Sequence, residues 1–270
     1  MKPGDLRLGA FPRICLWLGL IFLYVPLAML VLGSFNANRL VSVWSGFTLH
    51  WYAGLFSNEA LLQAAGLSLL VAATSATLAV LAGTQLAFVL ARRGVFRGRA
   101  LLALLGTAPL VIPEVILGLS LLLLFSGMED FLGWPRGRGL GTLILAHASF
   151  TVAFVSVVVQ ARLAGMDPQL EEAARDLGAT PWRSFREVTL PLILPGVVAG
   201  WLLAFTLSLD DVVIASFTSG PGGSTLPLLI WSKVRLGLAP EINALATLLM
   251  LVVTLCLLLS AWLFNRARSH

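Results

Sequence analysis

Three carboxylates lie inside stretches of this sequence that are otherwise apolar. Asp210 and Asp211 are adjacent in LAFTLSLDDVVIASF, residues 203–217, and Glu114 follows Pro113 in TAPLVIPEVILG. A charged side chain at the centre of a bilayer costs about 2.5–3.5 kcal/mol on insertion scales, so each acid needs a partner or a water-filled cavity. Acidic side chains that line such a cavity attract cations. The three acids therefore predict a path for a positively charged solute.

Glu114 is expected near the middle of a membrane span. Counted from Leu101 at about 1.5 Å per residue, it lies roughly 20 Å along the stretch 101–125. Pro113 has no N–H and frees the carbonyl of Pro109, and broken helices of this kind are tolerated where the backbone lines a cavity. A carboxylate beside a free carbonyl is the outline of a cation site. The alternative is a kinked packing helix whose glutamate pairs with an arginine, although the nearest arginines belong to loops.

The two adjacent aspartates are expected to act differently. Asp210 lies about 29 Å along the fifth apolar stretch when counted from Pro191, near its outer end. Neighbouring helical residues point about 100° apart, so both carboxylates face one cavity only where the helix unwinds. One aspartate then meets the solute, while the other caps a turn or contacts a partner subunit. The alternative is that both cap a helix end at the outer surface; Ser208 and Thr206 supply hydroxyls on the same segment.

Apolar stretches long enough to cross a bilayer occur six times. Of the 270 residues, 58% are hydrophobic and 11% are charged, whereas soluble domains carry about 25% charged residues. The mean hydropathy is +0.93. A spanning helix needs roughly 20 residues, so the predicted fold class is an all-α membrane protein. The six predicted transmembrane helices are 14–33, 64–91, 101–125, 141–161, 191–215 and 242–264, within a membrane domain 14–264 flanked by tails 1–13 and 265–270.

Basic residues favour one side of this predicted domain. The two tails and the loops 92–99 and 162–190 hold 13 of the 18 lysines and arginines. The positive-inside rule therefore predicts that both termini are cytoplasmic. The first apolar run is longer than the 7–15 residues of a secretory signal and has no convincing cleavage site, so we expect a retained helix. The pI near 10.0 then reflects topology and not nucleic-acid binding.

Motifs for catalysis or cofactor binding are missing from the sequence. No G-x-x-x-x-G-K-[ST] loop occurs, and SGPGGS at 219–224 lacks the lysine that phosphate binding needs. Cys15 and Cys256 are far apart and the three histidines are scattered, so neither a disulfide nor a metal site is predicted. His147 stands alone in LAHASF, which argues against an intramembrane enzyme, and a passive channel has no need of the long loop 162–190. No catalytic residue and no cofactor are predicted in this chain.

The loop 162–190 carries helix signals of its own. Asp167 before Pro168, and Thr180 before Pro181, are typical helix starts, and Gly178 stands where a left-handed C-terminal residue is wanted. The first of the two predicted helices has a small apolar stripe at positions i, i+3, i+4 and i+7. This stripe comprises Leu170, Ala173, Ala174 and Leu177. It must pack against something, either the chain's own membrane domain or a groove in a soluble partner.

The segment EAARDLGATPWRSFREVTLP, residues 172–191, resembles the EAA motif of the permease subunits of ABC importers. Every anchor of the motif matches: Glu172, Ala173, Ala174, Gly178, Val188, Leu190 and Pro191. In that family the motif is a coupling helix, which inserts into a cleft of the cytoplasmic ATPase and carries its closure to the membrane helices. The resemblance implies an ATPase-coupling site made of Glu171, Glu172, Ala173, Ala174 and Gly178.

Further stretches, including FLYVPLAMLVLGSFN, WYAGLF, APLVIPEVILGLSLLLLF and PEINALATL, are similar to polyamine permeases of the PotI and PotC type, and to the putrescine permeases most of all. The resemblance implies the type I, MetI-like importer fold in a bacterial inner membrane. It also implies a second permease subunit of the PotH or PotB kind, two ATPase subunits that bind ATP and Mg, and a periplasmic polyamine-binding protein.

A polyamine carries ammonium groups joined by methylenes, so it is matched by carboxylates and by aromatic faces. The resemblance implies a substrate path of Trp44, Glu114, Ser208, Asp210 and Asp211, to which Trp201 in the fifth span is added as an aromatic candidate. Glu114 stands where aspartate is expected in close relatives, which keeps the charge and lengthens its reach. The alternatives are another cationic solute or a metal ion, and, in other classes, a passive channel or an intramembrane enzyme.

Overall fold

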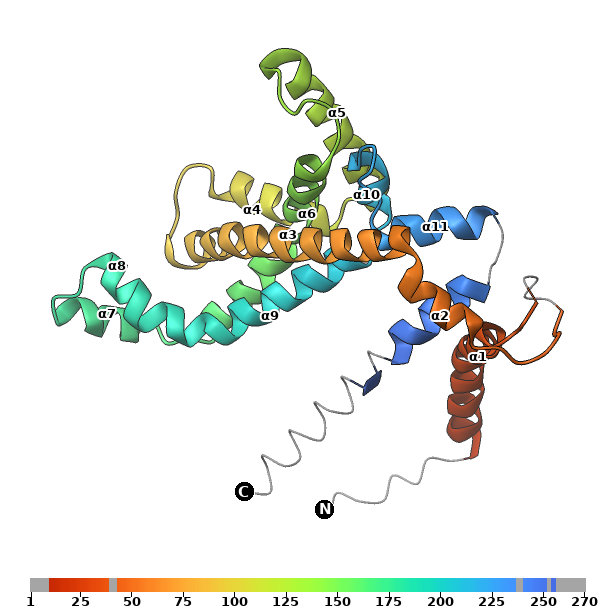
Figure 1. Ribbon diagram of the computed structural model, residues 1–270. Helices are drawn as coiled ribbons and strands as arrows, with labels where there is room; N and C mark the ends of the chain where they lie inside the picture. The colour runs from red at the N-terminus through yellow and green to blue at the C-terminus, as the bar shows by residue number, and fades with distance from the viewer. Residues whose placement is uncertain (1–9, 39–42, 237–239, 252–253, 256–270) are drawn as a thin grey trace. The chain divides into compact units, whose positions relative to one another are not determined.

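The computed structural model describes residues 10–38, 43–236, 240–251 and 254–255, and it divides the chain into two units (Figure 1). Unit 1 joins Met1–Glu59 to Ser232–His270, and unit 2 is Ala60–Trp231. Over the described residues the secondary structure is helical apart from one isolated β-bridge between Asn36 and Phe47. Most of the predicted tails and Cys256 lie outside the described residues.

Unit 1 contains α1 (Ala10–Ser34), α2 (His50–Ser57) and a helix over Pro240–Leu251. The loop between α1 and α2 is organised by Asn36, whose side chain donates to the Val43 carbonyl at 2.8 Å. Trp51 donates its indole N–H to the Asn36 carbonyl at 2.8 Å. No residue in the most apolar 18-residue window of α1 is buried, as suits a helix surrounded by lipid.

Unit 2 holds the remaining helices, with α6 at its centre. Its elements are α3 (Glu59–Arg92, whose first residue belongs to unit 1), α4 (Arg99–Thr107), the 3₁₀ turn η1 (Ala108–Leu110), α5 (Glu114–Leu132), α6 (Leu140–Ala164), α7 (Gln169–Asp176), α8 (Pro181–Ser184), the π-helical turn η2 (Phe185–Thr189), α9 (Leu190–Leu209), α10 (Val213–Thr218) and α11 (Leu226–Leu236, which runs into unit 1). Figure 1 shows α3, α6 and α9 running close together.

The helices α3, α6 and α9 approach closely because small residues line their contacts. A Cβ added to Gly83 of α3 would lie 2.8 Å from Cγ1 of Val155 on α6, and one added to Gly196 of α9 would lie 2.9 Å from Cβ of Arg162. Small residues at such crossings let helix backbones pack tightly in a membrane. The largest buried cluster forms there from Ala76, Ala79, Ala87, Val155, Val159, Leu163, Ile193 and Ala204.

Five helices in the described part of the chain are long and apolar enough to cross a bilayer. They are Phe11–Ser34, Glu59–Arg92, Glu114–Leu132, Leu140–Ala164 and Pro181–Leu209. The predictions of spans at 14–33, 64–91 and 141–161 are confirmed. The predicted span 242–264 lies partly outside the described residues, and the helix Pro240–Leu251 covers its beginning.

The prediction of one continuous span over 101–125 is wrong. The chain ends α4 at Thr107, makes the turn η1, leaves helical structure at Val111–Pro113 and starts α5 at Glu114. Pro113 is extended, with φ −55° and ψ 135°, and proline also disfavours helical geometry at the residue before it. Glu114 is therefore the first residue of a spanning helix and not the middle of one.

The predicted span 191–215 is also interrupted. The helix α9 ends at Leu209, Asp210 and Asp211 follow outside it, and the short α10 begins at Val213. At its other end this span is longer than predicted, since α8, η2 and α9 follow one another without a break from Pro181. The second of the two predicted loop helices is thus the beginning of the spanning segment.

Candidate functional site

The break between α9 and α10 buries Asp211 and uses its carboxylate as a helix cap. Its side chain accepts hydrogen bonds from the backbone N–H of Ile214, at 3.2 Å to Oδ1, and of Ala215, at 2.8 Å to Oδ2. The first N–H groups of a helix have no partner within the helix, and an aspartate that accepts from them stabilises it. Asp211 is 8% exposed. The carboxylate is therefore directed at the backbone of its own chain.

Asp210 has the opposite surroundings. It is the C-terminal cap of α9, where its N–H donates to the Thr206 carbonyl at 3.3 Å, and its side chain is exposed. Its carboxylate makes no hydrogen bond or ion pair with any residue that the structure describes. The helix ends just before the pair, in contrast to the continuous span predicted there, and one aspartate caps a turn, as the sequence indicates. The free carboxylate is that of Asp210.

A buried polar cluster lies directly beside Asp211. Nδ1 of His147, on α6, is 2.7 Å from the Ser208 hydroxyl, which is 3.0 Å from the Ser75 hydroxyl on α3. Nε2 of His147 is 3.4 Å from Oδ2 of Asp211, within ion-pair distance but without hydrogen-bond geometry. The description of His147 as an isolated residue is therefore wrong. Its partners Ser208 and Asp211 lie 61 and 64 positions away in the chain, and no local pattern points to them.

The order serine, histidine, aspartate in this cluster does not make it a hydrolase site. His147 is 1% exposed, and Ser208 is buried as well. The Asp211 carboxylate, which would have to orient the imidazole, is bound to two backbone N–H groups. A nucleophile must also be reachable by its substrate. The cluster is better described as a polar joint that fixes α3, α6 and α9 at the level of the break.

Glu114 belongs to the same region through the packing of α5 against α10. Gly118, one turn after Glu114, faces Phe217 of α10 so closely that an added Cβ would lie 2.6 Å from the ring. Phe125 of α5 and Ile214 of α10 share a buried cluster. Glu114 is exposed and lies within electrostatic range of both Asp210 and Asp211. Two helix breaks thus bring two accessible carboxylates, Glu114 and Asp210, into one neighbourhood.

The two candidate tryptophans lie in different places. Trp201 is half-buried on α9, stacks on Phe205 with 5.2 Å between ring centroids, and donates its indole N–H to the Thr77 hydroxyl at 3.1 Å. Trp44 belongs to unit 1 and is 59% exposed. The structure therefore places Trp201 in the same unit as the carboxylates, with its polar atom already paired, and leaves the ring of Trp44 open.

The candidate coupling segment folds as its sequence predicts. The Asp167 side chain accepts from the N–H of Gln169 at 2.9 Å, and the Thr180 hydroxyl accepts from the N–H of Arg183 at 3.3 Å. Gly178 has φ +85°, and the bonds from Gly178 N to Arg175 O and from Ala179 N to Ala174 O form a Schellman ending. The two predicted helix starts and the left-handed glycine are confirmed.

The apolar stripe of α7 does not pack against its own chain. Leu177 is 90% exposed, Leu170 and Ala173 are exposed, and Ala174 is half-buried. Glu172 is exposed too, whereas its neighbour Glu171 is buried. Of the two alternatives, a connector folded back on the membrane domain would have covered the stripe. The stripe is instead available to a partner chain.

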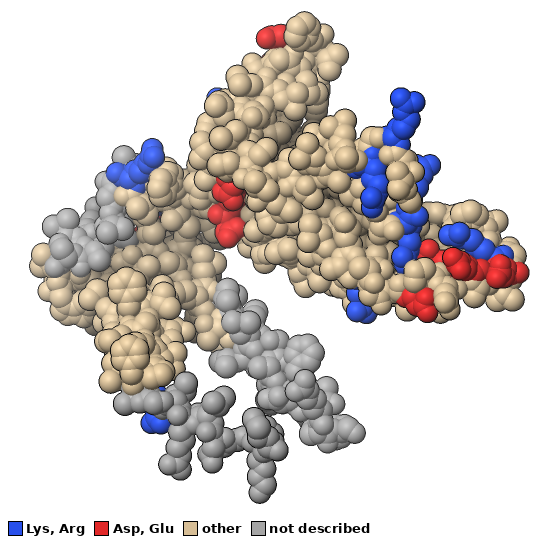
Figure 2. All heavy atoms as spheres, turned by 180° about the vertical axis from the view of Figure 1, so that it is seen from behind, with Lys and Arg blue, Asp and Glu red and all other residues tan. Residues whose placement is uncertain are grey.

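Both arginine-rich loops meet at one end of unit 2. Arg92, where α3 ends, is 3.1 Å from Glu171 of α7. Figure 2 shows basic residues gathered at this end, with acidic residues beside them. The structure thus agrees with the prediction that the loops 92–99 and 162–190 share one side of the protein.

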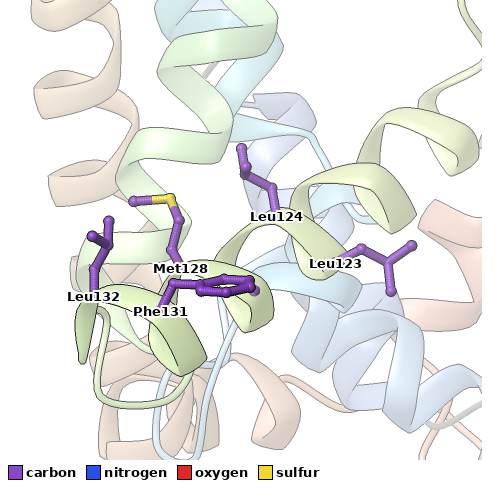
Figure 3. Close-up of a pocket in the computed structure, with 6 residues that line it drawn as sticks. Leu123, Leu124, Met128, Phe131 and Leu132 are labelled. Atoms are coloured by element: carbon purple, nitrogen blue, oxygen red, sulfur yellow. The ribbon is translucent and has the colours of Figure 1, made fainter.

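An open pocket on the surface of α5 has no polar lining. It is formed by Leu123, Leu124, Gly127, Met128, Phe131 and Leu132, and Figure 3 shows their apolar side chains along the last turns of the helix. Nothing in this lining holds a cation. The pocket is a feature of a surface that faces lipid or another apolar partner.

Comparisons with known proteins all match membrane components of transport systems. Residues 83–269 match the family described as "Binding-protein-dependent transport system inner membrane component". The chain is 53% identical over 257 residues to the putrescine transport system permease protein PotI of Escherichia coli K12, which covers 95% of this chain and 92% of that protein. It is 42% identical over 249 residues to the spermidine/putrescine permease protein PotC of Haemophilus influenzae, with 92% and 94% covered.

Solved structures show the same fold. A bacterial ABC transporter that imports alginate has a TM-score of 0.73 at 22% identity, with 94% of this chain and 92% of that chain covered. An inward-facing MetNI methionine ABC transporter has a TM-score of 0.60 at 19% identity, with 77% and 95% covered. At such identities the likeness concerns the fold alone.

Proposed function

Because the chain belongs to the family of binding-protein-dependent transport system inner membrane components, we propose that it forms part of the path by which a polyamine enters the cell. It is a multi-pass inner membrane permease subunit of the PotI and PotC type with the fold of ABC importer permeases, and it is not an enzyme. The predicted all-α, MetI-like fold class is confirmed. The solute and the residues that meet it are our proposal.

The observation that carries the proposal is that Glu114 and Asp210 lie at two neighbouring helix breaks. Both carboxylates are exposed, and α5, which begins at Glu114, packs against α10, which follows Asp210 after a short break. Two exposed acids in one neighbourhood suit a solute with an ammonium group at each end of an alkyl chain. The relatives named for putrescine and spermidine support a polyamine as the solute. The described residues contain no group of three or more side chains that could hold a metal ion, which gives a metal ion no comparable support.

The other members of the predicted path have supporting parts. We assign Asp211 and Ser208 to holding the α9–α10 break that presents Asp210, because their polar atoms are buried and occupied within the chain. Aromatic faces attract ammonium groups and cover methylenes. Trp44 has the more exposed ring of the two candidate tryptophans, and Trp201 offers a face that already stacks on Phe205.

Energy for uptake is proposed to come from partner ATPase subunits, which bind ATP and Mg. The exposed stripe of α7, with Glu172 and the end at Gly178, suits insertion into a groove of such a subunit. A second permease of the PotH or PotB kind and a periplasmic binding protein complete the proposed importer. Arginine-rich loops gathered at the α7 end support a cytoplasmic location for that end, and hence for both termini.

Uptake of labelled putrescine and spermidine into vesicles tests the proposal, with all partner subunits present. Glu114→Gln and Asp210→Asn remove charge with little change in shape. We expect each to lower uptake, and the double variant to lower it further. Asp130→Asn is the matched control, since Asp130 is an exposed acid at the far end of α5. Full uptake by the double variant, or uptake of neither polyamine by the unaltered protein, would refute the proposed solute path.

A further inference from the structure

Glu171 is a buried carboxylate at the centre of three elements. Its side chain belongs to α7 and is 5% exposed. Oε1 lies 3.1 Å from Nε of Arg92, the last residue of α3, and accepts a 2.9 Å hydrogen bond from the hydroxyl of Thr189, the last residue of η2. Nη2 of Arg175, one turn along α7, is 3.9 Å from Oε2. The carboxylate joins α7 to the ends of two long helices.

A buried charge is retained only where its partners compensate for lost hydration. Glu171 meets this condition on Oε1, where a guanidinium and a hydroxyl converge. Glu172, one position later, is exposed. Two adjacent glutamates thus have separate roles. One faces out of the chain, and the other anchors the helix from behind.

Close to the cluster of Glu171, Arg92 and Thr189, α3, η2, α6 and α9 make apolar contacts with one another. Phe88 of α3 meets Phe185 of η2 edge to face, with 5.2 Å between ring centroids. Leu163 and Ile193 are buried in the core cluster, with Met166 and Leu190 against it. Close-packed side chains transmit displacement and do not absorb it. A movement of α7 that reaches Arg92 and Thr189 through Glu171 is therefore passed on to α3 and α9.

Glu171 contacts the end of α3 and the residue before α9, and these two helices are also in contact near the candidate cation site. Thr189 directly precedes α9, which ends at Leu209 just before Asp210, and Arg92 ends α3, which carries Ser75. Ser75 contacts Ser208 of α9 beside that break. We propose that Glu171, Arg92 and Thr189 form a latch that makes α7, α3 and α9 move as one body, so that displacement of α7 by its partner reaches the break. Glu171 is a positioning residue in this role, which rests on the proposed function.

Charge reversal tests the latch in the complete importer reconstituted in vesicles. Arg92→Glu and Glu171→Arg each place like charges together, while the double exchange restores an opposite pair. For each single variant we expect at least a tenfold loss of solute taken up per ATP hydrolysed, with ATPase subunits still copurifying. The double variant should recover to within about threefold of the unaltered protein. Arg93→Glu is the matched control, because Arg93 is exposed and adjacent to Arg92.

A smaller change tests the latch in case the charge reversals prevent assembly of the complex. Thr189→Val removes one hydroxyl from the latch at nearly constant volume, and we expect a several-fold loss of coupling without loss of the complex. Normal coupling in Thr189→Val and in the assembled single reversals would overturn the latch. So would an assembled double variant that recovers nothing.

The proposed latch and the proposed solute are refuted by different results. If the unaltered importer carries no polyamine, the solute assignment falls. ATP hydrolysis stimulated by the binding protein then still reports coupling. Under the latch, the single reversals lose that stimulation and the double exchange regains it. Stimulation that is unchanged in the single reversals would overturn the latch whatever the solute.

Discussion

Replacing Asp211 and Asp210 one at a time by alanine should separate folding from transport. Asp211→Ala removes the acceptor of the Ile214 and Ala215 N–H groups. Loss of a helix cap costs about 0.5–2 kcal/mol, and a buried donor left unpaired costs about 1–3 kcal/mol. Removing a buried carboxylate recovers part of this cost, so we expect a net destabilisation of about 2 kcal/mol, which is a change of roughly thirtyfold in the ratio of folded to unfolded protein.

Asp210→Ala should behave in the opposite way. Its side chain is exposed and makes no hydrogen bond with the described residues, so its removal should change the free energy of unfolding by no more than about 0.5 kcal/mol. If Asp210 binds an ammonium group, the lost charge-assisted hydrogen bond is worth about 1.5–3 kcal/mol. At about 1.4 kcal/mol per factor of ten, uptake at low solute concentration should fall by roughly 10- to 100-fold.

Thermal unfolding in detergent, followed by the amount of monodisperse protein that survives heating, measures the first effect. We expect a decrease in Tm of roughly 4–8 °C for Asp211→Ala and of less than about 2 °C for Asp210→Ala. Asp211→Asn, which keeps one acceptor oxygen, should lie between Asp211→Ala and the unaltered protein. If Asp211→Ala unfolds normally but transports nothing, while Asp210→Ala transports normally, the assignment of the two carboxylates is reversed and the reasoning fails.

Three further predictions concern the packing and the partner surface. His147→Phe should lower the Tm, because Ser208 loses a buried hydrogen-bond partner at a cost of about 1–3 kcal/mol; an unchanged Tm would show that the polar joint adds no stability. Gly83→Leu should cost about 1–3 kcal/mol or prevent folding, because the added side chain meets Val155 on α6, whereas Gly127→Leu, which has open space around it, should be tolerated; equal effects would contradict the close crossing. Leu177→Asp should weaken copurification of the ATPase subunits at least tenfold with no change in Tm, since Leu177 is exposed, and normal copurification would remove α7 as a docking helix.

The sequence predicts best those features that depend on neighbouring residues. Asp167 and Thr180 mark helix starts by capping the N–H groups just after them, and Gly178 marks a helix end by its freedom at positive φ, so the coupling segment could be drawn in advance. Membrane spans could be predicted from long apolar runs because such runs also consist of neighbouring residues. Of the three acids in the apolar stretches, Asp211 has hydrogen-bond partners, as the sequence predicts for a carboxylate in such surroundings.

Features that depend on distant residues were missed. Pro113 predicts a disturbed helix, but a complete break with Glu114 at the start of a new helix, and the packing of that helix on α10 through Gly118 and Phe217, have no local sign in the sequence. His147 gives no local sign of its partners Ser208 and Asp211. The different surroundings of Glu171 and Glu172 likewise follow from Arg92, 79 positions before Glu171.

The break after Leu209 also has an electrostatic consequence. A helix that stops there leaves its last carbonyls without intrahelical partners, and aligned peptide dipoles place about half a negative charge at that end. The C-terminus of α9 thus adds to the charge of Asp210, as the ends of interrupted helices do at cation sites in other transporters. No side-chain substitution removes this contribution. Neutralised variants should therefore retain a weak, saturable preference for cations over neutral analogues of the same length.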